Sequence, residues 1–249
     1  MQSIGKKRYI RIYHPQTLSI GEEASLNEEA SHHIGTVLRL QYGDVFTLFD
    51  GHDHEYDVCI QEIKKKHVRV IVTEVHHVCR ESTLAIHLAQ GIAKGDRMTF
   101  SLQKAVELGV SEYTPIWTQH AAFKWDKNID SKKWLQWQNI MQSASEQCGR
   151  TRIPKLNPII SFDDFLKQHQ PANGFMLEPS KGVCWQKLSW QNKASATLLI
   201  GPEGGFSFTE IDNALHHDYQ ALTLGPRILR TETAVVSALS ILQATQGDL

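Results

Sequence analysis

The sequence predicts a mixed α/β protein, with a β-rich N-terminal part followed by a mostly parallel sheet that helices cover. Two observations support this fold class. Before residue 75, short β-branched and aromatic runs follow one another closely, which is typical of hairpins in a small barrel. From Leu84 onward, short apolar runs alternate with segments of helical periodicity, which is typical of β–α units. We place the boundary within 74–83 and expect one domain over residues 1–75 and another over residues 76–249.

The N-terminal part combines strands with one helix. Asn27 can cap this helix, and Glu28 and Glu29 are favourable in its first turn. The residues expected on its buried face are Ala30, Ile34, Val37 and Leu38. The expected strands are Arg8–Tyr13, Val45–Asp50, Tyr56–Ile63 and His67–Val75. The turn at Gly51–His54 and the lysine run 64–66 separate the last three strands, so we expect these strands to be neighbours.

In the second part, strands and helices alternate. Asp96 and Gly109 are expected to begin and end the first helix, while Ser131 and Gly149 bound a longer one. The expected strands are Leu84–Gln90, Tyr113–Trp117, Phe175–Glu178, Thr197–Ile200 and Ala221–Leu224. Helices follow the last two strands. Such alternation predicts a parallel sheet with helices on both faces.

The composition is that of an ordinary globular protein, with 41% apolar residues, 21% charged residues and a formal net charge of −1. Many nucleic-acid-binding domains are strongly basic, so an RNA surface on this chain must come from local clusters of cations. We expect no membrane span and no secretory signal, because no apolar run is long enough for either. The four cysteines lack CxxC spacing, so we expect neither zinc nor disulfides, and a cytoplasmic location.

A glycine-rich loop, Gly201–Ser207, follows the apolar strand that ends at Ile200. The next helix has a full start signal, because Ser207 and Glu210 form a capping box and Phe206 can pack against the first turn. In open α/β sheets, ligands bind at the edge where such loops lie. The loop has neither a Walker lysine nor the GxGxxG spacing. It is either part of a ligand site or a tight turn selected for its geometry.

A second loop, Leu224–Ala234, follows the last predicted strand at the same edge. Thr231 is the expected N-cap of the final helix. Arg227, Arg230 and Glu232 supply charge, and the apolar residues between the arginines can cover a planar ring. The alternative is a helix-capping turn with surface charges. Two such loops at one sheet edge favour a ligand site.

These two loops resemble the signature of a known family. The segments Leu199–Phe206 and Leu224–Ala234 are similar to the RsmE family, the 16S rRNA (uracil-1498-N3)-methyltransferases of the SPOUT class. The resemblance extends over nearly the whole chain. Further matching segments are Arg11–Pro15, His33–Arg39, Gln103–Val110 and Glu146–Arg150. The two loop motifs are long and unusual, so the resemblance is specific.

The resemblance implies a PUA-like β-barrel RNA-binding domain before a SPOUT methyltransferase domain with a trefoil knot, and a homodimer. It implies S-adenosyl-L-methionine as cofactor and 16S rRNA as partner, within the assembled small ribosomal subunit. The implied cofactor-binding residues are Leu177, Glu178, Pro179, Ile200, Gly201, Glu203, Gly204, Gly205, Leu224, Gly225, Ile228, Leu229, Thr231 and Ala234.

The candidate catalytic residues are Arg230, Glu232 and Arg227. Loss of the N3 proton places negative charge on the uracil oxygens, and an arginine can stabilise that charge. Glu232 or Glu203 can take the proton or orient an arginine, and the sequence leaves this choice open. The candidate RNA-binding residues are Arg8, Arg11, Arg39, Lys94, Arg150 and Arg152. The histidine pairs are not spaced as a metal motif, so no metal is expected.

Three other functions deserve comparison with this one. The chain can be a SPOUT methyltransferase with another RNA target, or an RNA-binding module with an inactive cofactor site. A nucleotide- or dinucleotide-using enzyme is a third alternative. The missing Walker lysine and the missing GxGxxG pattern count against the third.

Overall fold

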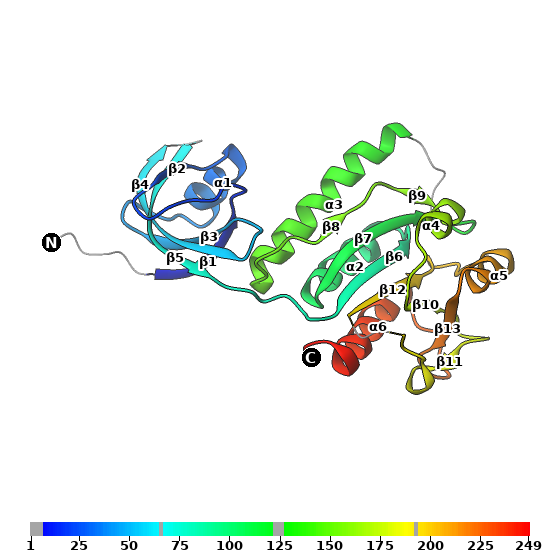
Figure 1. The fold of residues 1–249 in the computed structure, drawn as a ribbon. Helices are drawn as coiled ribbons and strands as arrows, with labels where there is room; N and C mark the ends of the chain where they lie inside the picture. The colour runs from blue at the N-terminus through cyan, green and yellow to red at the C-terminus, as the bar shows by residue number, and fades with distance from the viewer. Residues whose placement is uncertain (1–6, 65–66, 122–126, 192–193) are drawn as a thin grey trace. The chain divides into compact units, whose positions relative to one another are not determined.

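The computed structural model describes residues 7–64, 67–121, 127–191 and 194–249. It divides into two compact units (Figure 1). Unit 1 comprises the chain up to Glu81 together with Ser145–Ile153, and unit 2 comprises Ser82–Ala144 and Pro154–Leu249. The segment Ser145–Ile153 thus belongs to unit 1 although it lies far along the chain.

Unit 1 contains a sheet whose strands, among the described residues, follow the order β1-β3-β4-β5-β2. The β1–β3 pair is parallel and the other pairs are antiparallel. The strands are β1 (Lys7–Tyr13), β2 (Glu23–Ser25), β3 (Val45–Phe49), β4 (His54–Lys64) and β5 (His67–His77). The four predicted strands are present. The sequence analysis missed β2, because three residues are too short to display a period.

The predicted helix of unit 1 begins as expected and ends differently. Asn27 caps α1 (Glu28–His32), and its side chain accepts a hydrogen bond from the Ala30 amide. The helix continues as a π-helical turn, η1 (His33–Val37). The wider turn breaks the 3.6-residue period. Ile34 is therefore buried as predicted, whereas Val37 is 58% exposed and its predicted burial is wrong.

Unit 2 contains a parallel sheet, which confirms the predicted fold class. Its order in the described residues is β11-β13-β10-β12-β6-β7-β8, and β9 also pairs with β7. The strands are β6 (Ala85–Gly91), β7 (Val110–Trp117), β8 (Lys155–Leu156), β9 (Ile160–Ser161), β10 (Gly174–Leu177), β11 (Val183–Cys184), β12 (Ser195–Ile200) and β13 (Tyr219–Thr223). The short strands β8, β9 and β11 were not predicted. Since β13, β10, β12 and β6 are neighbours, the loops after them meet at one edge.

Helices of unit 2 pack in pairs, α2 against α6 and α4 against α5. The α4–α5 pair covers a core that includes Phe165 and Ile211 together with Leu199 of the sheet. The helices are α2 (Gly95–Glu107), α3 (Lys127–Cys148), α4 (Phe162–Gln168), the 3₁₀ turn η2 (Trp185–Lys187), α5 (Phe208–His216) and α6 (Thr231–Gln246). None of the described helices is long and apolar enough to span a membrane.

The predicted helix ends are confirmed at three positions. Ser207 and Glu210 form the expected capping box at α5. Gly109 and Gly149 follow α2 and α3 with φ of +76° and +90°, a conformation that glycine adopts without a Cβ clash. Gly109 lies at the predicted C′ position of α2, and Gly149 directly follows Cys148, the last residue of α3.

Three predicted helix starts are wrong. Lys94, not Asp96, is the N-cap of α2, and Asp96 lies in the first turn, where its charge still favours the helix dipole. Helix α3 begins at Lys127, before Ser131. Arg230 is the N-cap of α6, because the Thr231 hydroxyl is used elsewhere. A capping residue type marks the region of a start but does not fix the residue.

Candidate functional site

A cavity of about 440 Å³ lies in unit 2 at the carboxyl edge of β10, β12 and β13. Three chain segments form its walls, the start of the loop after β10, the glycine loop after β12, and the loop between β13 and α6. Its lining residues are Arg97, Leu177, Glu178, Pro179, Ile200, Gly201, Pro202, Glu203, Gly204, Gly205, Phe206, Leu222, Thr223, Leu224, Arg227, Ile228, Leu229, Arg230, Thr231 and Ala234. The two sequence loops thus face one space.

Almost every residue expected to bind the cofactor lines this cavity. The exception is Gly225, which is not part of the lining. Its φ is +112°, and its carbonyl accepts a hydrogen bond from the Thr223 hydroxyl at 3.2 Å. Gly225 therefore shapes the turn after β13, and any contact with a ligand stays a prediction.

Glycine is required where the glycine loop crosses the end of β6. A Cβ on Gly91 would lie 2.4 Å from Cδ and 2.5 Å from the backbone nitrogen of Pro202. A Cβ on Gly201 would lie 3.0 Å from the backbone of Gly205. The backbone is therefore packed so closely that no Cβ fits at Gly91, and the glycines expose backbone amide and carbonyl groups on this wall of the cavity.

The start of α6 is tied directly to the glycine loop. The Thr231 hydroxyl donates a 2.6 Å hydrogen bond to the carbonyl of Gly201. Thr231 is only 6% exposed, so this bond is shielded from water. It joins the loop after β12 to the helix after β13 and fixes two walls of the cavity relative to each other.

Glu178 fixes the wall of the cavity that the loop after β10 forms. This residue is 8% exposed, and its carboxylate accepts a 2.8 Å hydrogen bond from the Ser180 amide. Its own amide donates to the carbonyl of Leu222 at 3.0 Å. Glu178 thereby fastens the loop after β10 to β13, and its carboxylate is already satisfied within the loop.

Glu203 is engaged in a fixed set of bonds at the mouth of the cavity. Its Oε1 accepts hydrogen bonds from the Lys94 amide and from the Arg97 guanidinium, each at 3.0 Å. Burial opposes its ionised form, but these hydrogen bonds outweigh burial and lower the pKa of Glu203 below its ordinary value. Glu203 is therefore an ionised structural partner.

The carboxylate of Glu232, unlike that of Glu203, accepts few contacts from the described residues. Its Oε1 lies 3.9 Å from Nε of Arg97. Its Oε2 is shielded from solvent and has no hydrogen-bond partner in the part of the chain that the structure describes. Leaving a carboxylate oxygen without a donor is costly, so this atom is suited to accept one.

Arg227 and Arg230 are exposed cations that line the cavity. Among the described residues, neither guanidinium has a hydrogen-bond or ion-pair partner. Arg230 stands at the N-cap of α6, next to Thr231. Both cations are thus available to an anion or a polarised oxygen that enters the cavity.

The sequence analysis missed Arg97, which lies in the first turn of α2 and lines the cavity. The signal was present, because the loop after β6 reaches the same sheet edge as the two motif loops. Lys94 of this loop was predicted to bind RNA, but the loop lacks a glycine-rich motif, so Arg97 was not predicted to line a ligand site. Pro202 and Phe206 of the glycine loop, and Leu222 and Thr223 of the last predicted strand, also line the cavity and were not predicted as ligand contacts.

Three of the candidate RNA-binding arginines are engaged within unit 1. Arg11 donates to Glu55 Oε1 at 2.8 Å and to the carbonyls of Ser145 and Arg150 at 3.1 and 2.9 Å. Arg150 pairs with Glu81, and Arg152 pairs with Asp53. These bonds hold the segment Ser145–Ile153 in unit 1. Contact between these arginines and RNA stays a prediction.

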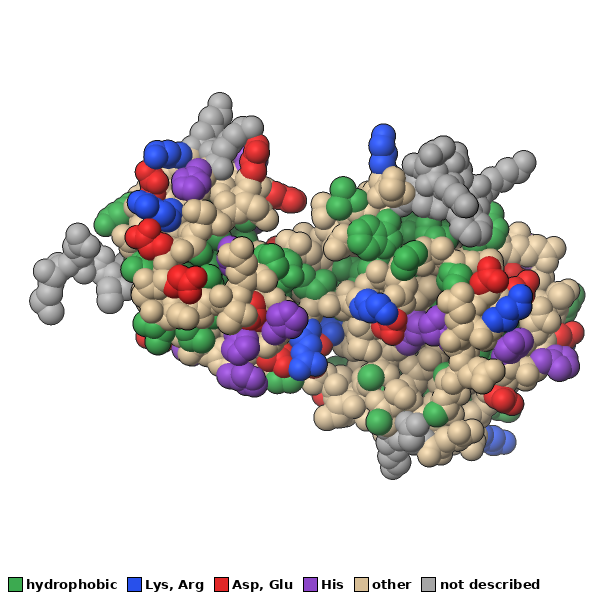
Figure 2. All heavy atoms as spheres, turned by 45° about the horizontal axis from the view of Figure 1, so that its top comes forward, with side chains coloured by type: hydrophobic (Ala, Val, Ile, Leu, Met, Phe, Trp, Pro, Cys, Tyr) green, Lys and Arg blue, Asp and Glu red, His purple; other side chains and the backbone are tan. Residues whose placement is uncertain are grey.

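The other candidate RNA-binding residues are placed differently. Arg39 and Lys94 are exposed, in unit 1 and unit 2 respectively. The side chain of Arg8 lies outside the described residues. On the face seen in Figure 2, lysine and arginine side chains are dispersed among acidic and histidine side chains. This dispersion agrees with the net charge of −1.

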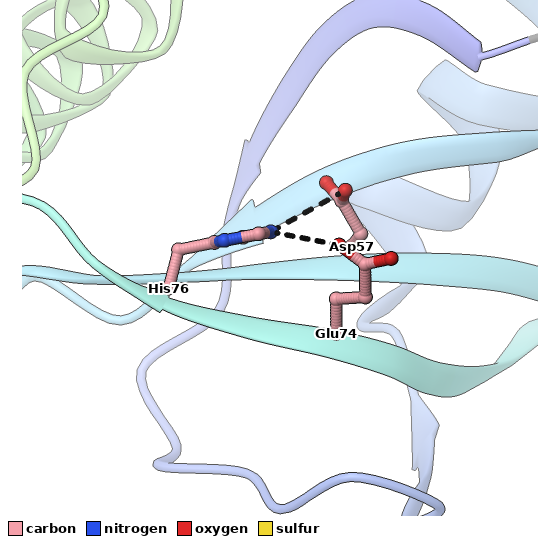
Figure 3. Close-up of side chains that lie close together, drawn as sticks. All are labelled: Asp57, Glu74 and His76. Carbon is pink, nitrogen blue, oxygen red and sulfur yellow. Dashed lines mark ion pairs between the residues drawn. The ribbon is translucent and has the colours of Figure 1, made fainter.

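A cluster of His and carboxylate side chains lies on neighbouring strands of unit 1 (Figure 3). Nε2 of His76 is 3.5 Å from Oδ2 of Asp57 and 3.5 Å from Oε2 of Glu74. The Thr47 hydroxyl orients the Asp57 carboxylate through a 3.1 Å hydrogen bond. Within the described chain, these three residues form the one group with metal-ligand spacing. Glu74 is 67% exposed, which is ordinary for a surface ion-pair cluster.

Comparison with known proteins gives matches over both parts of the chain. Residues 80–243 match a family described as RNA methyltransferase domain, and residues 26–73 match one described as RNA methyltransferase PUA domain. The chain is 37% identical to ribosomal RNA small subunit methyltransferase E of Buchnera aphidicola from Schizaphis graminum, over 98% of this chain and 99% of that one. It is 30% identical to the protein of the same name from Bacillus subtilis, over 94% of each chain.

Solved structures of similar proteins include two with a bound ligand. A methyltransferase of Legionella pneumophila in complex with the cofactor SAM is 45% identical, with a TM-score of 0.94 over 97% of this chain and 100% of that one. Ribosomal RNA small subunit methyltransferase E of Neisseria gonorrhoeae, bound to S-adenosyl methionine, is 32% identical, with a TM-score of 0.89 over 96% of this chain and 99% of that one.

Proposed function

Because this chain belongs to the ribosomal RNA small subunit methyltransferase E family, we propose that it methylates N3 of uridine 1498 in 16S rRNA, using S-adenosyl-L-methionine. The observation that carries the proposal is the cavity at the carboxyl edge of the parallel sheet, with two unpartnered arginines among the described residues and one unpartnered carboxylate oxygen near it. The cavity offers space for a cofactor, and the charged groups offer partners for a reaction beside it.

The residues of the cavity are suited to S-adenosylmethionine. Its volume of about 440 Å³ lies in the range of small-molecule sites. Leu177, Ile200 and Leu229 offer apolar surface to a flat ring, and the exposed backbone of the glycine loop offers hydrogen bonds to its edge. When bound, the cofactor supplies a methyl group activated by the sulfonium charge. The residues that we propose hold it are the cofactor-binding residues named from the sequence.

We assign three roles to the charged residues in and beside the cavity, where Glu232 is not a lining residue but follows the lining residue Thr231. Glu232 accepts the N3 proton at Oε2, since that atom has no donor of its own in the described chain. Arg227 and Arg230 face the negative charge that develops on the uracil oxygens. Glu203 is an unsuitable base, because its oxygen already accepts from Lys94 and Arg97. Much of the rate then comes from holding base and methyl group in line.

The partner in this proposal is 16S rRNA within the assembled small subunit, and the target base leaves its stack to reach the cavity. A composite protein–RNA surface agrees with the small net charge of the chain. We propose a PUA-like RNA-binding domain over residues 1–75 and a catalytic domain over residues 76–249. The knot and the homodimer stay predictions drawn from the family, and the cytoplasmic location stays a prediction drawn from the cysteine pattern.

The decisive experiment measures transfer of labelled methyl groups to small subunits isolated from cells that lack the gene. Primer extension then locates the product, because N3 methylation blocks base pairing and stops reverse transcriptase. We expect one new stop at uridine 1498. We expect Arg230→Ala to reduce the rate by ~10²-fold, as for loss of a charge-stabilising donor. Lys155→Ala, which removes a 71% exposed cation, is the control and should leave the rate unchanged.

A stop at another nucleotide would show that uridine 1498 is not the target, while methyl transfer to RNA would still be supported. If S-adenosylmethionine gives no heat of binding in calorimetry with the folded protein, the enzyme assignment is wrong. The chain would then be an RNA-binding module with an inactive cofactor site.

A further inference from the structure

Resting on the proposed methyl transfer, we propose that Arg97 is a positioning residue, which holds the Glu232 carboxylate in place to accept the uracil N3 proton. Arg97 lies in the first turn of α2, outside both motif loops. It nevertheless lines the cavity, with its side chain 43% exposed. Its guanidinium lies between a carboxylate from each motif loop.

One end of the guanidinium is anchored. Its NH1 group donates to Oε1 of Glu203 at 3.0 Å, and the same oxygen accepts from the Lys94 amide at 3.0 Å. Lys94 is the N-cap of α2, so Glu203 is bound to the same helix start from which Arg97 projects. A planar guanidinium held at one nitrogen keeps a defined direction for the others.

The other edge of the guanidinium faces the start of α6. Its Nε lies 3.9 Å from Oε1 of Glu232, whose side chain is 18% exposed. This ion pair leaves Oε2 as the carboxylate oxygen without a partner among the described residues. In this proposal, the contact with Arg97 at 3.9 Å orients the Glu232 carboxylate and leaves Oε2 for the base.

The uracil N3–H group is a donor of the kind that Oε2 lacks. The proton passes to Oε2 while the electron pair of the N–H bond stays on N3, which then uses it to bond the methyl group as the bond from the sulfonium sulfur to that methyl breaks and its electron pair stays on sulfur. The carboxylate becomes a neutral acid, so the charge balances. Oε2 is shielded in the free protein, and we expect it to meet the base when the neighbouring loop adjusts, since catalytic hydrogen bonds often tighten only in the complex. Ile228 of that loop is 87% exposed and is not packed down.

A double-mutant cycle tests this coupling. Single-turnover methyl transfer is measured at saturating RNA for the wild type, Arg97→Ala, Glu232→Gln and the double variant. We expect Arg97→Ala to lose ~10²-fold in rate, the typical effect of a misplaced group. In the Glu232→Gln background the same change should cost less than about threefold, because residues that act as a unit are not additive. Arg97→Lys should recover part of the rate.

Two further measurements separate positioning from simple damage. Calorimetric affinity for S-adenosylmethionine and the thermal midpoint should stay near those of the wild type in Arg97→Lys. Lys167→Ala removes a 70% exposed cation on α4 and controls for the loss of charge. It should behave as the wild type in every assay.

Additive losses in the cycle would overturn the proposal. So would an Arg97→Ala variant that keeps its rate but binds RNA more weakly and with a smaller salt dependence, since Arg97 would then be a phosphate contact. If the wild type itself transfers no methyl group, the proposed function fails instead. The two failures are thus distinguishable.

Discussion

At the scale of single residues, two carboxylates of similar appearance in the sequence have different surroundings. Glu203 and Glu232 each follow a strand end in a loop motif, and the sequence left their roles open. In the structure, Glu203 is bound by two donors at 3.0 Å, while Oε2 of Glu232 has none within the described chain. A residue type specifies which bonds are possible, and its neighbours decide which are made.

His87 allows a test of pH dependence at this scale. Burial lowers the pKa of His87 from 6.5 to about 4, against the opposing charge of Glu112. Its side chain lies in β6, 2.7 Å from the hydroxyl of Thr114. The unfolded chain takes up the proton near pH 6.5, whereas the folded chain does so only near pH 4. The contribution of His87 to folding stability is therefore fully present above pH 6.5 and is lost as the pH is lowered toward 4.

We expect this group to cost about 2 to 3 kcal/mol of unfolding free energy between pH 7.5 and pH 4.5. Urea unfolding at the two pH values measures the change. His87→Gln keeps a polar group but does not titrate, so its loss should be smaller by that amount. If the variant and the wild type lose the same unfolding free energy, His87 ionises as easily in the folded chain as in the unfolded chain.

At the scale of elements, the start of helix α6 shows a hydroxyl that makes a different hydrogen bond from the predicted one. Thr231 has the residue type of an N-cap, and the sequence predicted that role. The structure uses its hydroxyl to bind the carbonyl of Gly201 instead, and Arg230 occupies the cap without a side-chain bond. The helix gives up a capping bond, and the cavity gains a link between two of its walls.

Substituting Thr231 by Val tests this link with little change in shape. The carbonyl of Gly201 loses its donor, so we expect the unfolding free energy to fall by about 1 to 2 kcal/mol. We also expect ~10-fold weaker binding of S-adenosylmethionine, equivalent to about 1.4 kcal/mol. Urea unfolding and calorimetry provide the two measurements. Thr231→Ser keeps the hydroxyl and should retain affinity; unchanged affinity in the Val variant would contradict the link.

At the scale of the whole molecule, the segment Ser145–Ile153 is assigned to unit 1 although it follows most of α3. Arginine–carboxylate pairs and backbone carbonyls hold it there, with Arg11 at the centre. In the sequence these arginines resembled RNA contacts. The carboxylate partners of Arg11, Arg150 and Arg152 lie 44, 69 and 99 positions away along the chain, so no local pattern could reveal the pairing.

Arg11→Ala distinguishes a structural role from RNA contact. Its side chain is 15% exposed and its partner Glu55 is 10% exposed. Glu55 keeps its ion pair with Arg80, but the carbonyls of Ser145 and Arg150 lose the Arg11 donor, so we expect about 2 kcal/mol of lost unfolding free energy. Arg39→Ala changes an exposed cation and should alter stability by less than about 0.5 kcal/mol. If Arg11→Ala unfolds as the wild type does but binds RNA weakly, the structural role is wrong.

The sequence by itself determined the fold class, the parallel sheet, most strands and the two loops that line the cavity. These features depend on local periodicity, on glycine and on capping residues, all of which act within a few positions. It missed β2 and the short strands β8, β9 and β11, which span too few residues for a period. It also placed Val37 wrongly, because the π-helical turn shifts the helix face.

Only the tertiary structure decided which charged groups meet. Arg97 joins the site because β6 is the sheet neighbour of β12, so the loops after these strands reach one edge. Strand order is set by the packing of the whole chain, and nothing in the spacing of Arg97, Glu203 and Glu232 encodes it. The physical reason is that hydrogen bonds and ion pairs act over a few ångströms in space, whereas these residues lie more than 100 positions apart in the chain or in separate loops.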